Sequence, residues 1–375
     1  MNVEIKEVST NSELNKFIRF PYSLYKNNKY WVPTLDIDDR STLNKRKNPA
    51  FDFCEARYWM AYIDGEIVGR IAGIINHQAN KHWNERKVRF GWIDFVNDIE
   101  VAAALLQTVE TWANKNGCTE IHGPLGFTDL DREGMLVFGF DVVATYATNY
   151  NYEYYPEILE KLGYSKDVDW IQFELIIPNE KPDKLEKIAA LIAKRYNVHS
   201  LKATKTKQLL KYGPQVFDVL NQSYSQLYGF SPLTEKQIKI FTKQYIGFIK
   251  PEFVSIILND KDEVVAFGIT MPSLSVGVQK SKGKLLPFGW WHILKATKNS
   301  EVLDMYLIAV RPDMQNKGIN ALIFDDLMTN YIKNGVKKTI INPVLEINRK
   351  MMMIWEDYNP SEPIMRRRCF IKKIE

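Results

Sequence analysis

Residues 302–334 read VLDMYLIAVRPDMQNKGINALIFDDLMTNYIKN and decide the fold. The opening VLDMYLIAV is rich in β-branched and aromatic side chains and stops just before Pro312, so it predicts a strand. From Ile319 the apolar residues recur with helical spacing, and Gly335 is typical of a helix end. Between the two, Gly318 allows close backbone approach, and the free N–H groups at a helix start suit a phosphate. The stretch therefore predicts a strand, an anion-binding turn and a helix.

The turn, Gln315-x-x-Gly318-x-Asn320, resembles motif A of the GCN5-related N-acetyltransferases, whose pattern is Gln/Arg-x-x-Gly-x-Gly/Ala. In that family the amides of the turn bind the pyrophosphate of acetyl-coenzyme A, and the preceding strand lies alongside the pantetheine arm. Asn320 departs from the family's small residue. The resemblance implies a site for acetyl-CoA or another acyl-CoA as co-substrate. Its expected residues are Ile308, Val310, Gln315, Asn316, Lys317, Gly318, Ile319 and Asn320.

The order of elements along the chain points the same way. An early strand near Val3 to Val8 is followed by a helix, a hairpin around Asp64-Gly65 and a second strand–helix unit, and a similar series follows the linker Pro178-Asn-Glu-Lys-Pro182. This order resembles two consecutive acetyltransferase domains. We therefore expect an α/β protein with mixed sheets and two tandem domains, residues 1–178 and 179–375.

The first copy differs from the second in its turn. Asp98 and Glu100 fall in the first turn of its main helix, and no glycine precedes them. Carboxylates suit the positive end of a helix and would repel a pyrophosphate. We expect this copy to keep the fold and to lack the cofactor site.

Composition sets broad limits. A chain of 375 residues is long enough for two domains, and a net charge of +5 from scattered basic residues indicates an anionic cofactor at most, with no nucleic acid expected. Three distant cysteines favour a reducing compartment, and the histidines lack the spacing of a metal site. With no signal-like N-terminus or bilayer-length apolar run, we expect a cytoplasmic monomer or homodimer without a membrane span or metal.

Acyl transfer to an amine needs a base for the ammonium proton and a proton for the leaving thiolate. Asp304 lies eleven residues before Gln315, where several members of the family carry a carboxylate base, and alternation along the strand places Tyr306 on the same face. Glu346 is a second acidic candidate. Each residue also has a structural interpretation, because a strand Asp often holds a backbone group and a strand Tyr often packs.

The segment after residue 346 resembles the family's motif B. The resemblance implies that Asn348 hydrogen-bonds the pantetheine arm. A family tyrosine that often acts as the general acid is replaced here by Trp355, and Tyr358 lies one turn further along.

Two other segments have several interpretations. Residues 123–140 form a glycine-rich loop whose Asp129, Asp131 and Glu133 suit either a cationic acceptor or simply a turn region. Residues 273–299 combine a lysine-rich part with an aromatic part. They suit a lid or acyl-chain pocket, a surface helix that packs its aromatics inward, or a membrane-surface helix.

We therefore expect a CoA-dependent N-acyltransferase that acts on the amine of a small molecule, with acetyl-CoA as the first candidate donor. One alternative keeps the fold and uses an aminoacyl-tRNA or a long-chain acyl donor. The other is a module that binds acyl-CoA without catalysis.

Overall fold

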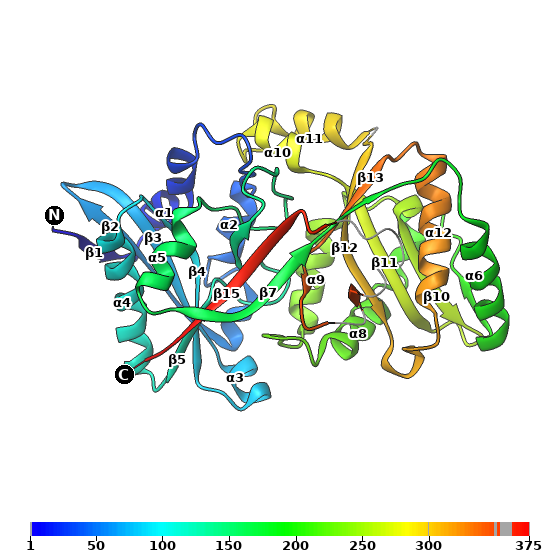
Figure 1. Ribbon diagram of the computed structural model, residues 1–375, viewed down its shortest axis with the longest axis horizontal. Helices are drawn as coiled ribbons and strands as arrows, with labels where there is room; N and C mark the ends of the chain where they lie inside the picture. Colours follow the sequence, from blue (N-terminus) through cyan, green and yellow to red (C-terminus); the bar gives the residue numbers. More distant parts are fainter. Residues whose placement is uncertain (1, 299, 349–350, 353–361, 375) are drawn as a thin grey trace.

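The structure is a computed structural model that describes residues 2–298, 300–348, 351–352 and 362–374. It shows two α/β halves side by side, each built on one mixed sheet (Figure 1). The expected fold class is confirmed. Within the part of the chain that is described, no helix has both the length and the hydropathy to cross a bilayer.

In the first sheet, the described strands pair antiparallel except for the parallel neighbours β4 and β5. Its strands in spatial order are β1 (Glu4–Glu7), β2 (Cys54–Ile63), β3 (Glu66–Asn76), β4 (Lys87–Phe95), β5 (Glu120–Gly123), β15 (Met365–Lys373), β7 (Ser165–Gln172) and β14 (Val344–Leu345), and β6 (Met135–Phe138) also pairs with β15. The helices of this half are α1 (Asn11–Leu24), α2 (Asp36–Thr42), the 3-10 turn η1 (Pro49–Asp52), α3 (His77–Trp83), α4 (Ile99–Lys115) and α5 (Tyr154–Lys161).

The second sheet repeats this plan, with β12 and β13 as its parallel pair. Its strands in spatial order are β8 (Glu174–Ile176), β13 (Lys338–Ile341), β12 (Val302–Val310), β11 (Val264–Pro272), β10 (Val254–Asn259) and β9 (Val198–Ser200). The remaining helices are α6 (Asp183–Tyr196), α7 (Thr206–Leu210), α8 (Gly213–Tyr224), α9 (Glu235–Tyr245), η2 (Pro251–Phe253), α10 (Ser275–Ser281), α11 (Gly289–Lys298), η3 (Pro312–Met314) and α12 (Asn320–Lys333).

Local sequence signals explain the main elements. Asp64 and Gly65 have positive φ angles of 50° and 84°, as a tight hairpin between β2 and β3 requires. Strand β12 has the predicted bounds, and α12 ends where Gly335 adopts a φ of 70°. Apolar side chains of α6 and α12 pack on one face of the second sheet, and those of α8 pack on the other. The site therefore lies on a sheet that is covered on both faces.

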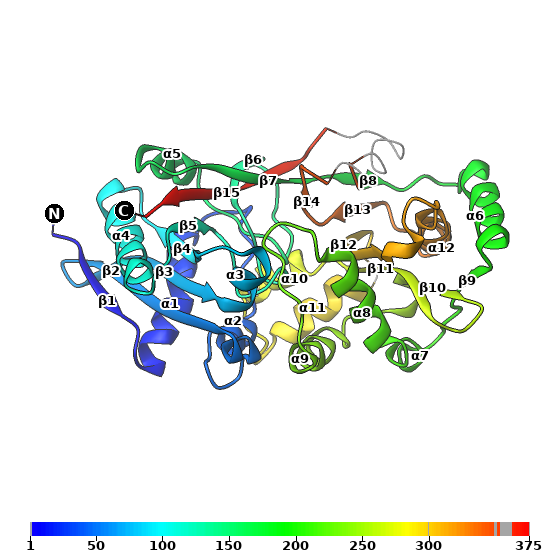
Figure 2. The same cartoon turned by 90° about the horizontal axis from the view of Figure 1, so that it is seen from below.

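The halves exchange strands, which the sequence analysis did not predict. The chain from Asp169 to Ile177 divides at Phe173 into β7 of the first sheet and β8 of the second. Strand β15 comes from the far end of the chain, yet it lies inside the first sheet, between β5 and β7 (Figure 2). No single point of the chain therefore separates the strands of one sheet from those of the other. The division at residue 178 stays a prediction about the sequence repeat.

Because β15 lies between β5 and β7, a chain of residues 1–178 would leave both strands without a hydrogen-bonded neighbour on that side. We therefore expect residues 1–178 not to fold alone. A chain in which a flexible linker joins residues 1–178 to residues 362–375 is expected to melt cooperatively in circular dichroism. The control carries the same linker with residues 362–375 in scrambled order. Cooperative melting of residues 1–178 without the added strand would contradict this account.

Candidate functional site

The site is organised by an irregularity in β12. Its pairing with β11 skips Tyr306, since Thr270 pairs with Met305 and Ile269 pairs with Leu307. Before this bulge Leu303 and Met305 contact the core beneath α6 and α12, and after it Ile308 and Val310 contact that same core. The extra residue therefore reverses the alternation of side chains along the strand and bends it locally.

Beyond the bulge, β12 and β13 separate. Their last parallel partners are Met305 and Ile341. Asn342 then donates from its backbone N–H to the Met305 carbonyl (3.0 Å) and from Nδ2 to the Tyr306 carbonyl (3.1 Å). Pro343 follows and has no N–H to continue the ladder. The two strands consequently splay apart, and the space between them is lined by Tyr306, Ile308, Val344, Asn348 and Met351.

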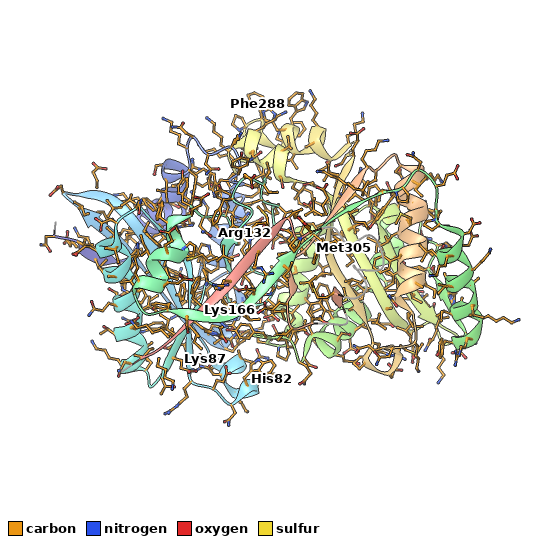
Figure 3. All side chains as sticks on the ribbon, in the orientation of Figure 1. His82, Lys87, Arg132, Lys166, Phe288 and Met305 are labelled. Carbon is orange, nitrogen blue, oxygen red and sulfur yellow. The ribbon has the colours of Figure 1, made fainter. Side chains whose placement is uncertain are left out.

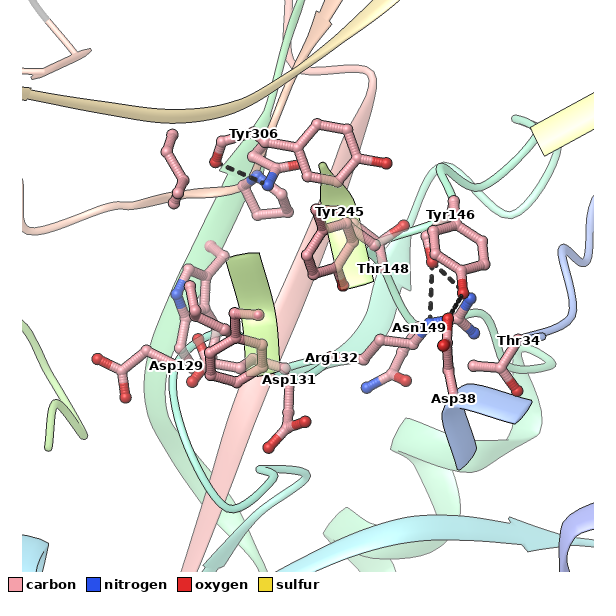
Figure 4. Close-up of a pocket in the computed structure, with 18 of the residues that line it drawn as sticks. Thr34, Asp38, Asp129, Asp131, Arg132, Tyr146, Thr148, Asn149, Tyr245 and Tyr306 are labelled. Atoms are coloured by element: carbon pink, nitrogen blue, oxygen red, sulfur yellow. Dashed lines mark hydrogen bonds between the residues drawn. The ribbon is translucent and has the colours of Figure 1, made fainter. Parts of the chain in front are cut away.

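This opening belongs to a cavity of about 450 Å³ between the two halves (Figure 4). One wing is apolar and lies between the second sheet and helices α7 to α9. Its lining residues include Leu209, Val216, Phe217, Phe241, Ile249 and Ile256. The other wing reaches the first half and is rich in acids and tyrosines. A ligand there would meet both domains.

Three acids on the loop between β5 and β6 line the cavity. Burial raises the pKa of Asp129 to about 7 and that of Asp131 to about 6, with Arg89 opposing both shifts. Burial and the charge of Asp129 also raise the pKa of Glu133 well above its usual range. Among the described residues, Oδ1 of Asp129 and Oε1 of Glu133 have no hydrogen-bond partner. The cluster therefore offers unpaired oxygens that a cation would satisfy.

A second polar group faces these acids. The Tyr146 hydroxyl donates to Asp38, and Arg132 Nε donates to the Tyr146 carbonyl at 3.0 Å. In the view of Figure 4, Tyr245 lies near Tyr306, and their ring centroids are 6.4 Å apart. Burial raises the pKa of Asp38, so its carboxyl group also titrates above the usual range.

Asp304 and Tyr306, the first two predicted catalytic residues, lie near one another. Asp304 is 1% exposed, outside the cavity lining. Burial raises its pKa to about 7, with the Ser273 hydroxyl opposing the rise, although neither carboxylate oxygen forms a hydrogen bond of normal geometry among the described residues. Tyr306 lines the cavity, and burial together with the Asp304 charge raises the pKa of its hydroxyl well above 10. Tyr306 is therefore protonated at neutral pH.

Glu346 lies elsewhere. It accepts a hydrogen bond from Lys166 at 2.9 Å and lies 3.4 Å from Arg366, both on strands of the first sheet. Like Asp304, Glu346 is absent from the cavity lining. Asn348 does line the cavity, and its Oδ1 accepts from the Met351 N–H at 3.3 Å. Trp355 and Tyr358 lie outside the described residues.

The predicted phosphate turn lies past the end of β12. Asn316 and Gly318 have positive φ angles of 60° and 77°, which turn the backbone toward α12. In the described chain, the N–H groups of residues 316–319 donate to no protein acceptor. Lys317 supplies a positive charge and lies 5.4 Å from the Tyr196 ring. Free amides, a glycine and a lysine fit a pyrophosphate.

The strand leading to this turn presents carbonyl groups on its open edge. The Tyr224 hydroxyl donates to the Ile308 carbonyl (3.2 Å), and the Ser223 hydroxyl donates to the Val310 carbonyl (2.9 Å). Both donors are side-chain hydroxyl groups, which can rotate away from these carbonyls, whereas the backbone N–H groups of a paired strand cannot. A ligand amide could replace them at this edge.

The equivalent place in the first half is filled. The N–H of Leu125 donates to the Phe90 carbonyl at 2.8 Å, so the acidic loop enters between β4 and β5. Further along β4, the Tyr155 hydroxyl accepts from the Phe95 N–H (3.0 Å) and the Tyr154 hydroxyl donates to the Phe95 carbonyl (2.6 Å). The carboxylate of Asp98, at the start of α4, accepts from the Glu100 N–H.

One trio of described residues has the spacing of a metal site. Ligand atoms of His122, Asp167 and Cys369 lie within 4.8 Å of one another. The Tyr228 hydroxyl already joins them, at 2.7 Å from His122 Nδ1 and 2.6 Å from Asp167. Burial lowers the pKa of His122 well below its usual range, so the trio is explained as a buried hydrogen-bond network.

Sequence reasoning singled out the loop of Asp129 but missed the opposing group. Asp38, Tyr146 and Tyr245 come from three separate segments, and nothing in the local sequence marks them as neighbours. The run Asp36-Ile-Asp-Asp39 gave no signal either, because acids are ordinary in the first turn of a helix.

Comparisons with known proteins agree with this geometry. No protein-family model matches the chain. It is 28% identical over 372 residues to the bacterial ceramide synthase of Caulobacter vibrioides, covering 95% of this chain and 94% of that one. It is 26% identical over 373 residues to Protein YghO of Escherichia coli, covering 97% and 93%.

Among solved structures, a tandem GNAT protein from the clavulanic acid biosynthesis pathway aligns over 100% of this chain and 99% of its own, with a TM-score of 0.58 and 10% identity. A GCN5-related N-acetyltransferase from Sphaerobacter thermophilus aligns over 100% and 96%, with a TM-score of 0.54 and 11% identity. Since both alignments span both halves, the chain has the tandem-domain fold of the GCN5-related N-acetyltransferases.

Proposed function

We propose that the protein is an acyl-CoA-dependent N-acyltransferase with one working cofactor site, in the second domain. The observation that carries this proposal is the splay between β12 and β13, which opens into a cavity lined by unpaired acids. The first domain would have lost its site, since its own splay is filled by Leu125 and capped by Tyr154 and Tyr155.

The proposed cofactor contacts follow from the free groups of the second domain. Backbone amides of Gln315, Asn316, Lys317, Gly318, Ile319 and Asn320 would hold the pyrophosphate. Ile308, Val310 and Asn348 would border the pantetheine arm, where side-chain donors can be exchanged for ligand amides. When bound, the thioester supplies an activated carbonyl carbon.

The acceptor is proposed to be an amine with a long aliphatic chain. Asp129 and Glu133 would pair with its ammonium group, because their unpaired oxygens are costly to bury without a partner. The apolar wing would enclose the hydrocarbon of the amine or of the acyl donor. This wing favours a long-chain substrate over the aminoacyl-tRNA alternative, and the name of the Caulobacter relative is consistent with a lipid amine.

The proton transfers can be assigned to this chain's own residues. Because Asp304 lies outside the cavity lining, it would accept a proton from the ammonium through one water, so that the amine nitrogen can attack the carbonyl carbon. As the carbon–sulfur bond breaks, the Tyr306 hydroxyl would supply a proton to the departing thiolate and would regain one from the nitrogen, which loses its second proton as the amide forms. Glu346 stays an alternative base, although its ion pairs with Lys166 and Arg366 oppose that role.

Gly318→Glu tests the proposed function. A Cβ at this position would lie 3.1 Å from Ile192, and a carboxylate would repel a pyrophosphate, so we expect acyl-CoA-dependent thiol release with a long-chain primary amine to disappear. Gly335→Glu is the matched control, since Gly335 has a similar φ of 70°, open space around it and a place at the far end of α12. Equal thiol release from both variants would contradict the assigned turn. Wild-type protein that binds acyl-CoA but releases no thiol with any amine would support a non-catalytic module instead.

Asp304→Asn tests the proposed base. We expect turnover to fall by about 10²–10⁴-fold, the range for a general base, while acyl-CoA affinity barely changes. The loss should shrink at high pH, where more of the amine is already neutral. Asp326→Asn is the control, because Asp326 is a buried carboxylate that pairs with Lys202 outside the cavity. Unaltered turnover across the pH range would exclude Asp304.

The pH dependence of the unfolding free energy of Asp304→Asn gives a second, independent test. Because the pKa of Asp304 is about 7 in the folded protein and 3.8 ordinarily, the folded state retains a proton between these values that the unfolded chain has released. Stability from this group is therefore present below about pH 4 and lost as pH rises toward 7. Relative to wild type, Asp304→Asn should gain stability from pH 4.5 to pH 8, by up to about 4 kcal/mol. A gain that does not grow with pH in denaturant titrations would show that burial does not hold this carboxyl protonated.

A further inference from the structure

The segment formed by α10, residues 282–288 and α11 presents a strongly apolar outer surface. Leu286 is 77% exposed and Phe288 is 71% exposed, and both tryptophans of α11, Trp290 and Trp291, are about half exposed. Leu294 continues the same surface. Figure 3 shows Phe288 at the outer rim of the molecule, pointing away from both sheets. We call this group of residues the apolar rim.

The rim has a positive border. Between Glu263 and Glu301 the chain contains no Asp or Glu and five lysines, which are Lys280, Lys282, Lys284, Lys295 and Lys298. Among the described residues none of these lysines forms an ion pair with an acid. Lys295 instead lies 5.2 Å from the Trp291 ring. Uncompensated lysines beside exposed aromatics match a surface that is both negative and apolar.

The base of the segment is firmly held, so the exposure is not a consequence of a loose end. Leu274, Val278 and Ile293 are buried in a shared core with Val32 and Leu35 of the first half. In addition, Gln279 Nε2 donates to the Trp31 carbonyl (2.9 Å), and the Asp36 N–H donates to the Gly283 carbonyl (2.8 Å). On the other side, Lys250 Nζ donates to the Thr297 carbonyl at 2.9 Å.

These anchors lie beside the cavity. Trp31, Thr34 and Ile249 belong to its lining. Trp31 itself accepts the hydrogen bond from Gln279 of α10, and Ile249 directly precedes Lys250, which holds α11. The segment therefore spans the two halves (Figure 1), and residues beside its anchors line the cavity.

We propose that the apolar rim docks on the surface of a membrane containing anionic lipids. Aromatic and aliphatic side chains would enter the headgroup boundary while the bordering lysines pair with lipid phosphates. A second copy of this chain is a poorer occupant, because a symmetric contact would bring the five lysines of each copy together. The inference does not depend on the proposed function, since its test measures membrane binding and no catalysis.

The test is cosedimentation of the full chain with vesicles of phosphatidylcholine, with and without about 30% phosphatidylglycerol. We expect binding to the anionic vesicles, weakened by added salt, and little binding to phosphatidylcholine alone. The double variant Phe288→Ser/Trp291→Ser and the triple variant Lys280→Gln/Lys282→Gln/Lys284→Gln should each bind at least about tenfold more weakly.

Matched controls lie on α6, at the far end of the molecule. Leu191 is 64% exposed, and Leu191→Ser and Lys187→Gln remove an exposed apolar group and a lysine without touching the rim. Both controls should bind vesicles like wild type, and thermal melting checks that every variant is folded. Rim variants that bind as well as the controls would overturn the proposal. Concentration-dependent dimers that are abolished by Phe288→Ser/Trp291→Ser, without vesicle binding by wild type, would overturn it in favour of a contact between copies.

Discussion

Placement of β15 between β5 and β7 is the constraint on which the rest of the structure depends. This strand comes from the end of the chain and completes the sheet of the first half, while β8, only one residue after β7, completes the sheet of the second. The chain therefore crosses between the two sheets at Phe173, between β7 and β8, and again at residues 342–343, between β13 and β14. Because these crossings are only one and two residues long, they restrict how far the two walls of the cavity can move apart.

Arg367 of β15 shows how the exchange positions the site. Its side chain is fully buried and donates to Gln172 Oε1 (2.8 Å), the Thr148 hydroxyl (3.0 Å) and the Asn149 carbonyl (2.9 Å). Burial lowers the pKa of this guanidinium to about 9. Thr148 and Asn149 line the cavity. Among the described residues no acid forms an ion pair with Arg367, so these three hydrogen bonds to the loop and to β7 are what satisfy the buried cation.

The two repeats illustrate how one fold keeps or loses a site. In both, a parallel pair of strands separates after a few residues. In the first half a loop, two tyrosine hydroxyls and the Asp98 cap satisfy the freed backbone groups. In the second, residues 316–319 keep free amides and the splay stays open. The acidic loop that fills the first splay then projects Asp129 into the cavity of the second.

Local chemistry made most of the fold predictable. Strand β12, the Gly318 turn and α12 follow from β-branched residues, a proline and helical periodicity, which act over a few positions. The exchange of β15 was not predictable in the same way, because the alternation in Met365 to Lys373 specifies a strand and its faces but not its partners. The bulge at Tyr306 was missed for a similar reason, since one extra residue leaves no mark in composition. The cavity groups Asp38, Asp129 and Tyr245 meet only through the tertiary fold.

We propose that the chain holds one functional coenzyme A site, although it contains two copies of the fold. Titration calorimetry of the full chain with coenzyme A measures this directly, because the free amides of residues 316–319 occur in one copy and the corresponding place in the other is filled. The account predicts one equivalent of coenzyme A per chain. Two equivalents would show that the first domain has kept its site, and the absence of binding would contradict the assignment of the second.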